Sequence, residues 1–294
     1  MKKYDVVGIL VVFNKIPSID QISGILSSGI TSICLVNNNP NYSEDEFSWV
    51  NSCNNVLLIN NNNIGGLAGA YNKALNYIDK ELKSSTHIIF LDDDSNFTAL
   101  KNYISSGFTQ KFLLNNENLV MGPRYIESAT GLLGRCVRLS RFWFKVSSPL
   151  EKSLVRVSFI INSFSIWPRT IISQIGRFDE SLSIDHIDTD FCMKAKLLNI
   201  PIYINNSIIF EHSIGERVPY KFLWFNLQSS GHSAERKALI VRNTRILIFR
   251  YGFSNIGFLG LCVTRLIYEF ISVIFAEKNK LKKLLFMVKG LIYK

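Results

Sequence analysis

Residues 87–96, HIIFLDDDSN, pass from an apolar run directly into three consecutive aspartates. The run 88–91 is typical of an interior strand of a parallel sheet, which is covered on both faces. Asp92, Asp93 and Asp94 would then lie together at the carboxyl end of that strand. Three adjacent negative charges repel one another, so the arrangement is costly unless a positive charge lies among them. Taken alone, the triplet is equally well explained as an acidic turn that caps the next helix, with Asp94 or Ser95 as the N-cap.

The residues before this stretch alternate between strand and helix patterns. We predict strands at residues 6–14, 32–39, 55–60 and 87–94, and helices at residues 18–29 and 65–82. Alternation at this spacing indicates βαβ units with right-handed crossovers and a parallel sheet. Ligands of such sheets bind beyond the carboxyl ends of the strands. The asparagine-rich segments after the second and third strands fall at the same edge as the aspartates, so this part of the chain resembles a nucleotide-binding region.

The later part of the chain is less regular. We predict short β-like runs around 119–126 and 155–166, a turn and a helix within 177–200, and a strand at 201–213. Beyond about residue 235 the pattern is helical and markedly apolar. The fold class is therefore α/β, with a helical appendage at the C-terminal end.

Composition and cysteine usage exclude several classes of protein. The 294 residues are 47% hydrophobic and 19% charged, which argues against disorder. The five cysteines are scattered and form no CxxC pair, which favours a reduced, cytosolic chain over a disulfide scaffold or a zinc site. The N-terminal apolar run is interpreted as a first strand and not as a signal peptide, because Asp5 interrupts it and no small-residue cleavage site follows.

The net charge of +10 is concentrated in the C-terminal segment. Residues 236–294 contain twelve Lys or Arg and two Glu, so the rest of the chain is neutral. Such a basic segment indicates either nucleic acid or an anionic membrane surface as a partner. Within it, residues 256–276 are long enough to span a bilayer, with Arg265 and Glu269 on one helical face. We predict a helix that lies in the membrane interface with that face wet, and a cap packed on the body is the alternative.

Two further groups of residues fit a site at the edge of the sheet. Three glycines in NIGGLAGA (63–70) allow the backbone to approach a ligand closely, although tight packing of a helix on a strand explains them equally well. The stretch IDHIDTDFCMKAK (184–196) places three aspartates at a helix start, where the helix dipole alone would stabilise them. His212 closes a later strand. Two carboxylate groups and a histidine on one sheet edge form a plausible site for a divalent metal and a base.

These motifs occur in the order expected of family-2 glycosyltransferases with the GT-A fold. They are LVNNN (35–39), NNNIGGLAGAYNKAL (61–75), IIFLDDDS (88–95), FDESLSIDHIDTDFCMKAK (178–196) and FEHSIG (210–215). The chain resembles this family over about residues 5–250, and most closely its bacterial rhamnosyltransferase-like branch, where a phrase similar to IDHIDTDFC is characteristic. The resemblance implies a GT-A catalytic domain at 1–235, with a nucleotide-binding half at about 1–100 and an acceptor-side half at about 101–235. Residues 236–294 would be the helical appendage.

The resemblance also implies roles for single residues. Asp92 and Asp94 match the Asp-x-Asp element that holds Mn²⁺ or Mg²⁺ on the donor's diphosphate, and His212 matches a further metal ligand. Asp93, which points the other way in an extended segment, would meet the donor sugar or ribose. Asp188 matches the catalytic base.

The remaining predicted residues contact the donor or the acceptor. The donor-binding residues are Asn14, Asn37, Asn38, Asn39, Asn63, Gly65, Gly66 and Gly69. The acceptor-binding residues are Asp185, His186 and Asp190. Many relatives have aspartate then asparagine after the second strand, where this chain has two asparagines, so the identity of the nucleotide stays open. A second departure is ALIVRN (238–243), where relatives often carry tyrosines before Arg-Asn.

The resulting hypothesis is a metal-dependent, inverting transfer of a sugar from a nucleoside diphosphate to a hydroxyl of a cell-surface polysaccharide or lipid-linked glycan. Rhamnose is suggested by the family branch, with galactofuranose, galactose and glucose as alternatives. The expected location is the cytoplasm, peripherally at the inner face of the cell membrane, with no nucleic-acid partner. One rival hypothesis is a nucleotidylyltransferase, which would carry a glycine-rich stretch with Arg and Lys after the first strand. The others are a nucleic-acid-binding protein that uses the basic segment and an inactive sugar-binding module.

Overall fold

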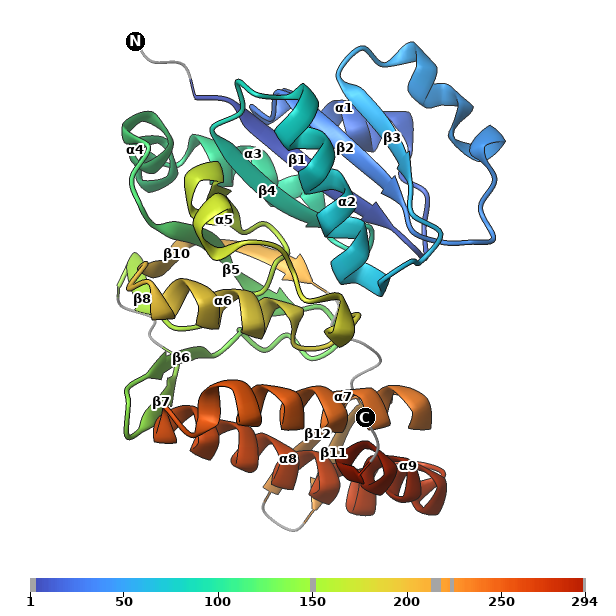
Figure 1. The fold of residues 1–294 in the computed structure, drawn as a ribbon, viewed down its shortest axis with the longest axis vertical. Helices are drawn as coiled ribbons and strands as arrows, with labels where there is room; N and C mark the ends of the chain where they lie inside the picture. The colour runs from blue at the N-terminus through green and yellow to red at the C-terminus, as the bar shows by residue number, and fades with distance from the viewer. Residues whose placement is uncertain (1–3, 149–151, 213–217, 223–224, 293–294) are drawn as a thin grey trace. The chain divides into compact units, whose positions relative to one another are not determined.

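The computed structural model describes residues 4–148, 152–212, 218–222 and 225–292 (Figure 1). Contacts divide the chain into two compact units. The first comprises residues 1–125 and 149–211, and the second comprises residues 126–148 and 212–294. The second unit joins a segment from the middle of the chain to the C-terminal helices, and the predicted division at residue 235 stays a prediction. The end of the FEHSIG motif, residues 213–215, lies outside the described residues.

The first unit is built on a sheet with the strand order β3-β2-β1-β4-β9-β5-β10-β8. The strands are β1 (Val6–Val12), β2 (Ser32–Asn37), β3 (Val56–Asn60), β4 (His87–Asp92), β5 (Val120–Glu127), β8 (Leu154–Val157), β9 (Ile166–Pro168) and β10 (Ile202–His212). β3, β2, β1 and β4 pair in parallel. β9 is antiparallel to β4 and β5, and β10 is antiparallel to β8. The predicted parallel sheet is therefore confirmed for the N-terminal half, and the sheet is mixed beyond it.

Helices cover this sheet on both faces. They are α1 (Ile19–Ser27), η1 (Glu44–Ser52), α2 (Gly66–Glu81), η2 (Phe97–Ala99), α3 (Leu100–Ser105), α4 (Gly107–Asn115), α5 (Arg169–Ile175), η3 (Glu180–Leu182) and α6 (Ile187–Leu197). In Figure 1, α2, α5 and α6 lie in front of the sheet, and α1 and α3 lie behind it. The predicted helices at 18–29, 65–82 and within 177–200 are confirmed with shorter bounds.

Strand β4 shows why an apolar run precedes the aspartates. Ile89 and Leu91 belong to the core formed with α1, α3 and α4. On the opposite face the Phe90 ring contacts the rings of Tyr71 and Phe178, with centroid separations of 4.8 and 5.5 Å. Because side chains of a strand alternate between faces, both faces of β4 require apolar residues. The strand is buried up to the point where its carboxylates begin.

The second unit contains two hairpins and three long helices. The hairpins are β6 (Cys136–Leu139) with β7 (Phe144–Ser147), and β11 (Val218–Phe222) with β12 (Phe225–Ser229). The helices are α7 (Ala234–Leu247), which continues into the π-helical turn η4 (Ile248–Gly252), α8 (Ile256–Ala276) and α9 (Lys280–Ile292). The predicted helical character beyond residue 235 is confirmed.

The three long helices share a small core and a buried ion-pair network. Val241, Val273 and Met287, one from each helix, are buried together. The fully buried Lys237 of α7 places its Nζ atom 2.6 Å from Glu269 Oε2 and 2.7 Å from Glu277 Oε1. Glu277 also pairs with Lys283 of α9 at 2.6 Å. A buried lysine is tolerated only with such partners, so the network ties the three helices into one body.

Candidate active site

The first aspartate of the triplet is fixed through both carboxylate oxygens. Asp92 ends β4 and pairs with Val11 of the parallel strand β1. Its Oδ1 atom accepts a hydrogen bond of 3.1 Å from the Tyr71 hydroxyl, and its Oδ2 atom accepts one from the Ser163 hydroxyl. These bonds hold the carboxylate at the carboxyl end of the strand.

The second aspartate turns toward the loop after β1. Asp93 Oδ2 accepts hydrogen bonds from the backbone N–H groups of residues 13, 14 and 15, at 2.8, 2.6 and 3.0 Å. A carboxylate that gathers several N–H groups fixes the course of a loop. The structure thus gives Asp93 a role in shaping the loop, and its predicted contact with the donor stays a prediction.

Asp94 points the same way as Asp92 and joins it in a cluster with His212. His212 is the last residue of β10, a strand of the same sheet. One ligand atom from each of Asp92, Asp94 and His212 lies within 4.8 Å of the others. Carboxylate oxygens and an imidazole nitrogen are suitable ligands for Mn²⁺, and the carboxylates also suit Mg²⁺. The three residues therefore fit a divalent cation.

The charge of the triplet is consistent with such a cation. Partial desolvation, and then the negative charges of Asp92 and Asp93, raise the pKa of the Asp94 carboxyl to about 7. A cation among these groups would offset the repulsion and favour the ionised form.

Asp188 lies in the first turn of α6, where its Oδ1 atom accepts a hydrogen bond of 2.6 Å from the Thr189 N–H. Burial and then the charge of Asp92 raise the pKa of the Tyr71 hydroxyl well above its usual value, and the charge of Asp188 adds to this. Asp92 and Asp188 thus both act on one buried phenol, although 96 positions separate them in the chain. The predicted base and the predicted metal ligands lie in one neighbourhood.

The residues around Asp188 differ in their surroundings. His186 is the N-cap residue of α6 and has a left-handed backbone with φ of 69°, and Ser183 has φ of 60°. Left-handed non-glycine residues are uncommon and cluster at functional sites. His186 and Asp185 are half-buried, whereas Asp190 is only 1% exposed and its carboxylate pairs with Lys194 at 2.9 Å. Asp190 thus has a partner inside the protein, and the predicted acceptor contacts of Asp185, His186 and Asp190 stay predictions.

Of the three predicted glycines, Gly65 and Gly66 bring the start of α2 close to the segment that leads to Asp188, and Gly69 packs on Ile64 just before the helix. A Cβ atom at Gly69 would overlap the Ile64 carbonyl oxygen, and one at Gly66 would lie 2.8 Å from the Ser183 carbonyl oxygen. Gly65 and Gly66 also have left-handed backbones, with φ of 68° and 64°. The glycines therefore serve close packing, and their predicted contact with the donor stays a prediction.

The predicted asparagines after β2 form a network with asparagines after β3. Asn37 Nδ2 donates to Asn60 Oδ1 at 3.3 Å, and Asn38 Nδ2 donates to Asn63 Oδ1 at 3.4 Å. Asn61 Nδ2 donates to Asn38 Oδ1 at 2.8 Å. Because Asn37 and Asn38 are buried, these amides hold the carboxyl ends of the two strands together.

Two other predicted donor residues connect the loop after β1 to this edge. Asn39 Nδ2 donates to the Phe13 carbonyl oxygen at 2.6 Å, and the Asn14 carbonyl oxygen accepts a hydrogen bond of 2.9 Å from the Tyr42 hydroxyl. The structure thus brings Asn14 and Asn37 to Asn39 to one edge of the sheet.

Sequence reasoning missed three polar residues of this region. Tyr71 and Ser163 donate hydrogen bonds to Asp92, and Asn162 acts to lower the pKa of the Tyr71 hydroxyl. Tyr71 lies inside the motif NNNIGGLAGAYNKAL, which was a usable signal. Ser163 and Asn162 lie in an irregular segment without any motif.

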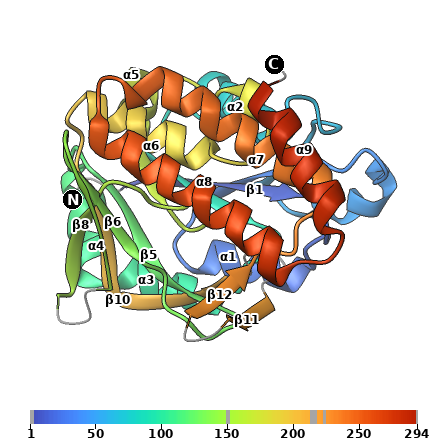
Figure 2. The ribbon, with the colours of Figure 1, turned by 90° about the horizontal axis from the view of Figure 1, so that it is seen from below.

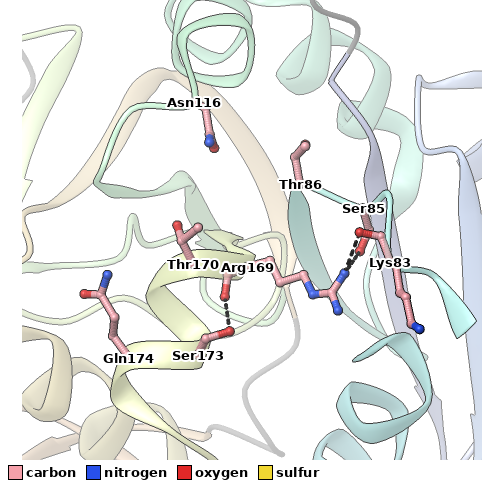
Figure 3. Close-up of a pocket in the computed structure, with 8 residues that line it drawn as sticks. All are labelled: Lys83, Ser85, Thr86, Asn116, Arg169, Thr170, Ser173 and Gln174. Carbon is pink, nitrogen blue, oxygen red and sulfur yellow. Dashed lines mark hydrogen bonds between the residues drawn. The ribbon is translucent and has the colours of Figure 1, made fainter. Parts of the chain in front are cut away.

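A recess elsewhere on the first unit is not this site (Figure 3). It is lined by Lys83, Ser85, Thr86, Asn116, Arg169, Thr170, Ser173 and Gln174. Figure 3 shows Arg169 directed toward Ser85 and Lys83. Ser85 and Thr86 precede β4 whereas the aspartates follow it, and a six-residue strand is about 20 Å long. The recess therefore lies at the opposite end of the strand.

Comparison with known proteins shows which proteins the chain is similar to. No family model matches the chain. The chain is 23% identical over 290 residues to the dTDP-rhamnosyl transferase RfbF of Shigella flexneri, covering 95% of this chain and 91% of RfbF. Its fold is similar to that of the crystal structure of GalNAc-T7 with UDP, GalNAc and Mn²⁺, with a TM-score of 0.52 and 13% identity. That similarity covers 74% of this chain but only 44% of GalNAc-T7, so the chain spans less than half of that protein. HddC from Yersinia pseudotuberculosis, with a TM-score of 0.37 and 15% identity, is too dissimilar to carry an argument.

These similarities and the sheet described above agree with the sequence-based expectation. The α/β architecture of the GT-A type is confirmed by the sheet and by GalNAc-T7. The similarity to RfbF extends over nearly the whole chain. The resemblance to the rhamnosyltransferase-like glycosyltransferases is thereby confirmed, and it supports a glycosyltransferase function for this protein.

Proposed function

We propose that this protein is an inverting, metal-dependent glycosyltransferase. It moves a sugar from a nucleoside diphosphate donor to a hydroxyl group of a growing cell-surface polysaccharide or lipid-linked glycan. The observation that carries this proposal is the cluster of Asp92, Asp94 and His212 at the carboxyl edge of the sheet. Asp188 lies close enough to the same edge to act on Tyr71.

The metal would be held by Asp92, Asp94 and His212. A divalent cation bound there supplies Lewis-acid stabilisation of the charge that develops on the departing diphosphate. Tyr71 and Ser163 orient Asp92 through their hydroxyl groups, as second partners of metal ligands generally do.

Asp188 is the general base of the proposed reaction. Its carboxylate takes the proton from the acceptor hydroxyl while that oxygen forms a bond to the anomeric carbon of the donor. The bond from that carbon to the diphosphate breaks on the opposite side, and the electron pair leaves with the diphosphate. A single displacement without a protein nucleophile inverts the anomeric configuration, by the same geometry as in inverting hydrolases.

The first donor to test is dTDP-rhamnose, because the name of RfbF specifies a dTDP-rhamnosyl transferase. The buried amides of Asn37 and Asn38 occupy the strand end where many relatives carry a carboxylate. The donor panel must therefore include other nucleotides and the alternatives galactofuranose, galactose and glucose.

The test is thermal unfolding of the full chain with this donor panel, with Mn²⁺, with Mg²⁺ or with EDTA. The cognate donor should raise the melting temperature only when metal is present, because a ligand that binds the folded state stabilises it by mass action. Asp94→Asn should abolish this metal-dependent shift, and Asp20→Asn on the exposed start of α1 is the matched control. Product formation with a glycan acceptor is then followed by mass spectrometry. Full transfer in EDTA, or a donor shift that ignores metal, would refute the metal-dependent mechanism.

A further inference from the structure

Exposed apolar side chains are concentrated in the second unit. Among the described residues, 27 large apolar side chains are exposed, and 18 of them belong to this unit. The second unit is much the smaller of the two. Soluble proteins rarely expose apolar side chains in such numbers on neighbouring elements without an interaction partner.

Helix α8 carries one part of this surface. It is long and apolar enough to cross a membrane, with a mean hydropathy of 1.8 over its best 18-residue window, yet only 28% of that window is buried. A core helix of this composition would be mostly buried. The exposed residues that share one helical face are Ile256, Val263, Ile267 and Ile274.

The opposite face of α8 is committed to the second unit. Phe258, Leu261 and Cys262 are buried, and Glu269 pairs with the buried Lys237. Arg265 is exposed, whereas the Glu269 carboxylate pairs with the buried Lys237 and its side chain is 23% exposed. The face of α8 that carries Ile256, Val263, Ile267 and Ile274 is therefore apolar, and the Glu269 carboxylate on the other side is paired with Lys237.

Helix α9 repeats this pattern with lysines beside it. Leu281, Leu285, Val288 and Ile292 recur at helical spacing and are exposed, the first two to 79% and 64%. Lys282 and Lys289 lie next to this stripe, with their Nζ atoms 5.5 and 5.1 Å from the centroid of the Phe286 ring. An apolar stripe bordered by lysines is the pattern of a helix that lies in a membrane interface. Figure 2 draws α8 and α9 in the foreground, diverging from the turn that joins them, and the two helices contact each other.

Aromatic residues extend the apolar surface beyond α8. Phe142 and Trp143 are exposed at the turn of the β6–β7 hairpin. A Cβ atom at Gly257 would lie 2.5 Å from the Trp143 carbonyl oxygen, so this turn packs directly on the start of α8. Phe253, just before α8, is also exposed. Tryptophan and other aromatic rings are favoured at the level of lipid headgroups.

The charge of the second unit indicates which partner this surface fits. Its sequence contains eighteen Lys or Arg and five Asp or Glu, a net charge of +13, whereas the first unit carries −3. Glu269 and Glu277 are already paired with Lys237. A second copy of the chain would bring the same positive charge to the interface and be repelled, whereas an anionic lipid surface is complementary.

We infer that the second unit docks peripherally on anionic bilayers through the exposed apolar faces of α8 and α9, with the β6–β7 turn beside them. Docking by these faces leaves the Lys237 network and the small helical core intact. Insertion of α8 across the bilayer would separate Glu269 from Lys237 and remove Phe258 and Leu261 from their packing. This inference rests on the surface of the second unit alone and is independent of the proposed function.

The test is co-sedimentation of the full chain with lipid vesicles. One set is made of phosphatidylcholine alone, and in the other about one third of the lipid is the anionic phosphatidylglycerol. Binding should require the anionic lipid and fall about tenfold when salt rises from about 0.05 M to about 0.5 M. Leu281→Glu with Leu285→Glu should weaken binding at least about tenfold, because the variant removes apolar contact area. Leu197→Glu with Leu198→Glu, at exposed leucines of the first unit, is the matched control and should bind normally. Thermal unfolding verifies that both variants fold.

Three outcomes would overturn the inference. The first is that the protein does not bind vesicles at low salt. The second is that the Leu281→Glu with Leu285→Glu variant and the Leu197→Glu with Leu198→Glu variant lose binding equally. The third is binding that only detergent reverses, which would indicate that α8 spans the bilayer. Sedimentation velocity without vesicles addresses a second copy as the occupant. A stable dimer that Leu281→Glu with Leu285→Glu dissociates, in a protein that ignores vesicles, would assign the surface to self-association.

Discussion

At the scale of single residues, the aspartates of the triplet 92–94 and Asp188 differ in what their carboxylates contact. Asp92 and Asp94 face His212, Asp93 organises the loop after β1, and Asp188 approaches the same edge from α6. The sequence could predict these carboxylates because they stand, in order, in motifs that resemble those of family-2 glycosyltransferases, whereas each cluster taken alone also fits a helix cap. It could not predict Tyr71 as their neighbour, because a tyrosine in an amphipathic helix has the same pattern whether its hydroxyl meets a carboxylate or water.

The base assignment predicts a specific kinetic defect. Asp188→Asn should lower kcat by roughly 10²–10⁴-fold while donor binding stays nearly unchanged, since only the proton acceptor is lost. Asp190→Asn is the control two positions away. It should instead lower stability by about 1–3 kcal/mol, because Asp190 is buried and paired with Lys194. Steady-state kinetics and urea denaturation separate the two effects. Loss of turnover in Asp190→Asn alone would move the base within the motif.

The hydrogen bond from Tyr71 to Asp92 predicts an effect on metal affinity. Tyr71→Phe removes the hydroxyl that lies 3.1 Å from Asp92 Oδ1 but keeps the ring that packs on Phe90. Mn²⁺ affinity should fall about tenfold, the usual effect of losing a partner of a metal ligand. Mn²⁺ titration followed by electron paramagnetic resonance measures it. An unchanged affinity would show that Ser163 suffices to orient Asp92.

The buried His87 at the start of β4 predicts a pH dependence of stability. Burial lowers the pKa of its imidazole to about 4, from an ordinary value near 6.5. Above pH 6.5 the imidazole of His87 is neutral in both the folded and the unfolded protein. Between pH 6.5 and 4 only the unfolded state takes up the proton, so the free energy of unfolding should fall by about 3 kcal/mol as pH decreases. Urea unfolding between pH 6.5 and 4, with EDTA present, measures this decrease. The His87→Leu variant should not show it, whereas His186→Gln, a change at a half-buried histidine, should still show it.

At the scale of elements, periodicity predicted the strands and helices that have long, regular patterns. The short helices α3, α4 and α5 and the β6–β7 hairpin were not predicted. Each of these helices spans fewer than ten residues, and the hairpin pairs two four-residue strands. Such short elements contain too few repeats of the apolar pattern for it to be recognised. Their conformation depends on packing against distant parts of the chain, which local sequence does not show.

The start of α2 gives a prediction at this scale. Gly69→Ala should lower the free energy of unfolding by about 3 kcal/mol or more, because the new Cβ atom would overlap the Ile64 carbonyl oxygen, which belongs to the backbone. Gly24→Ala in α1 is the matched control, since a Cβ atom there meets nothing within 4 Å. In a helix interior it should stabilise the protein by up to about 1 kcal/mol. Denaturant titration of both variants checks the pair, and equal effects would contradict the packing argument.

At the scale of the whole molecule, composition separated a neutral body from a basic segment but did not indicate which distant residues pack with that segment. Residues 126–148 group with the C-terminal helices, and the contact of the Trp143 carbonyl with Gly257 shows why. More than a hundred positions separate these residues. No local sequence pattern predicts a contact between residues so far apart, whereas the positive charge of residues 236–294 follows from counting lysines and arginines.

The buried network of the second unit tests whether the two units are distinct bodies. Burial acts to raise the pKa of the Glu277 carboxyl, but hydrogen bonds from Lys237 and Lys283 hold it below its usual value. Glu277→Gln removes the charge that both lysines share, so the second unit should lose about 3 kcal/mol of stability. Glu235→Gln breaks an exposed pair with Lys282 in the same unit and should have no measurable effect. Hydrogen–deuterium exchange measured by mass spectrometry should show faster exchange in α7, α8 and α9 of Glu277→Gln, with β1, β4 and α2 unchanged. Equal acceleration in both sets of peptides would mean that the two units open as one cooperative body.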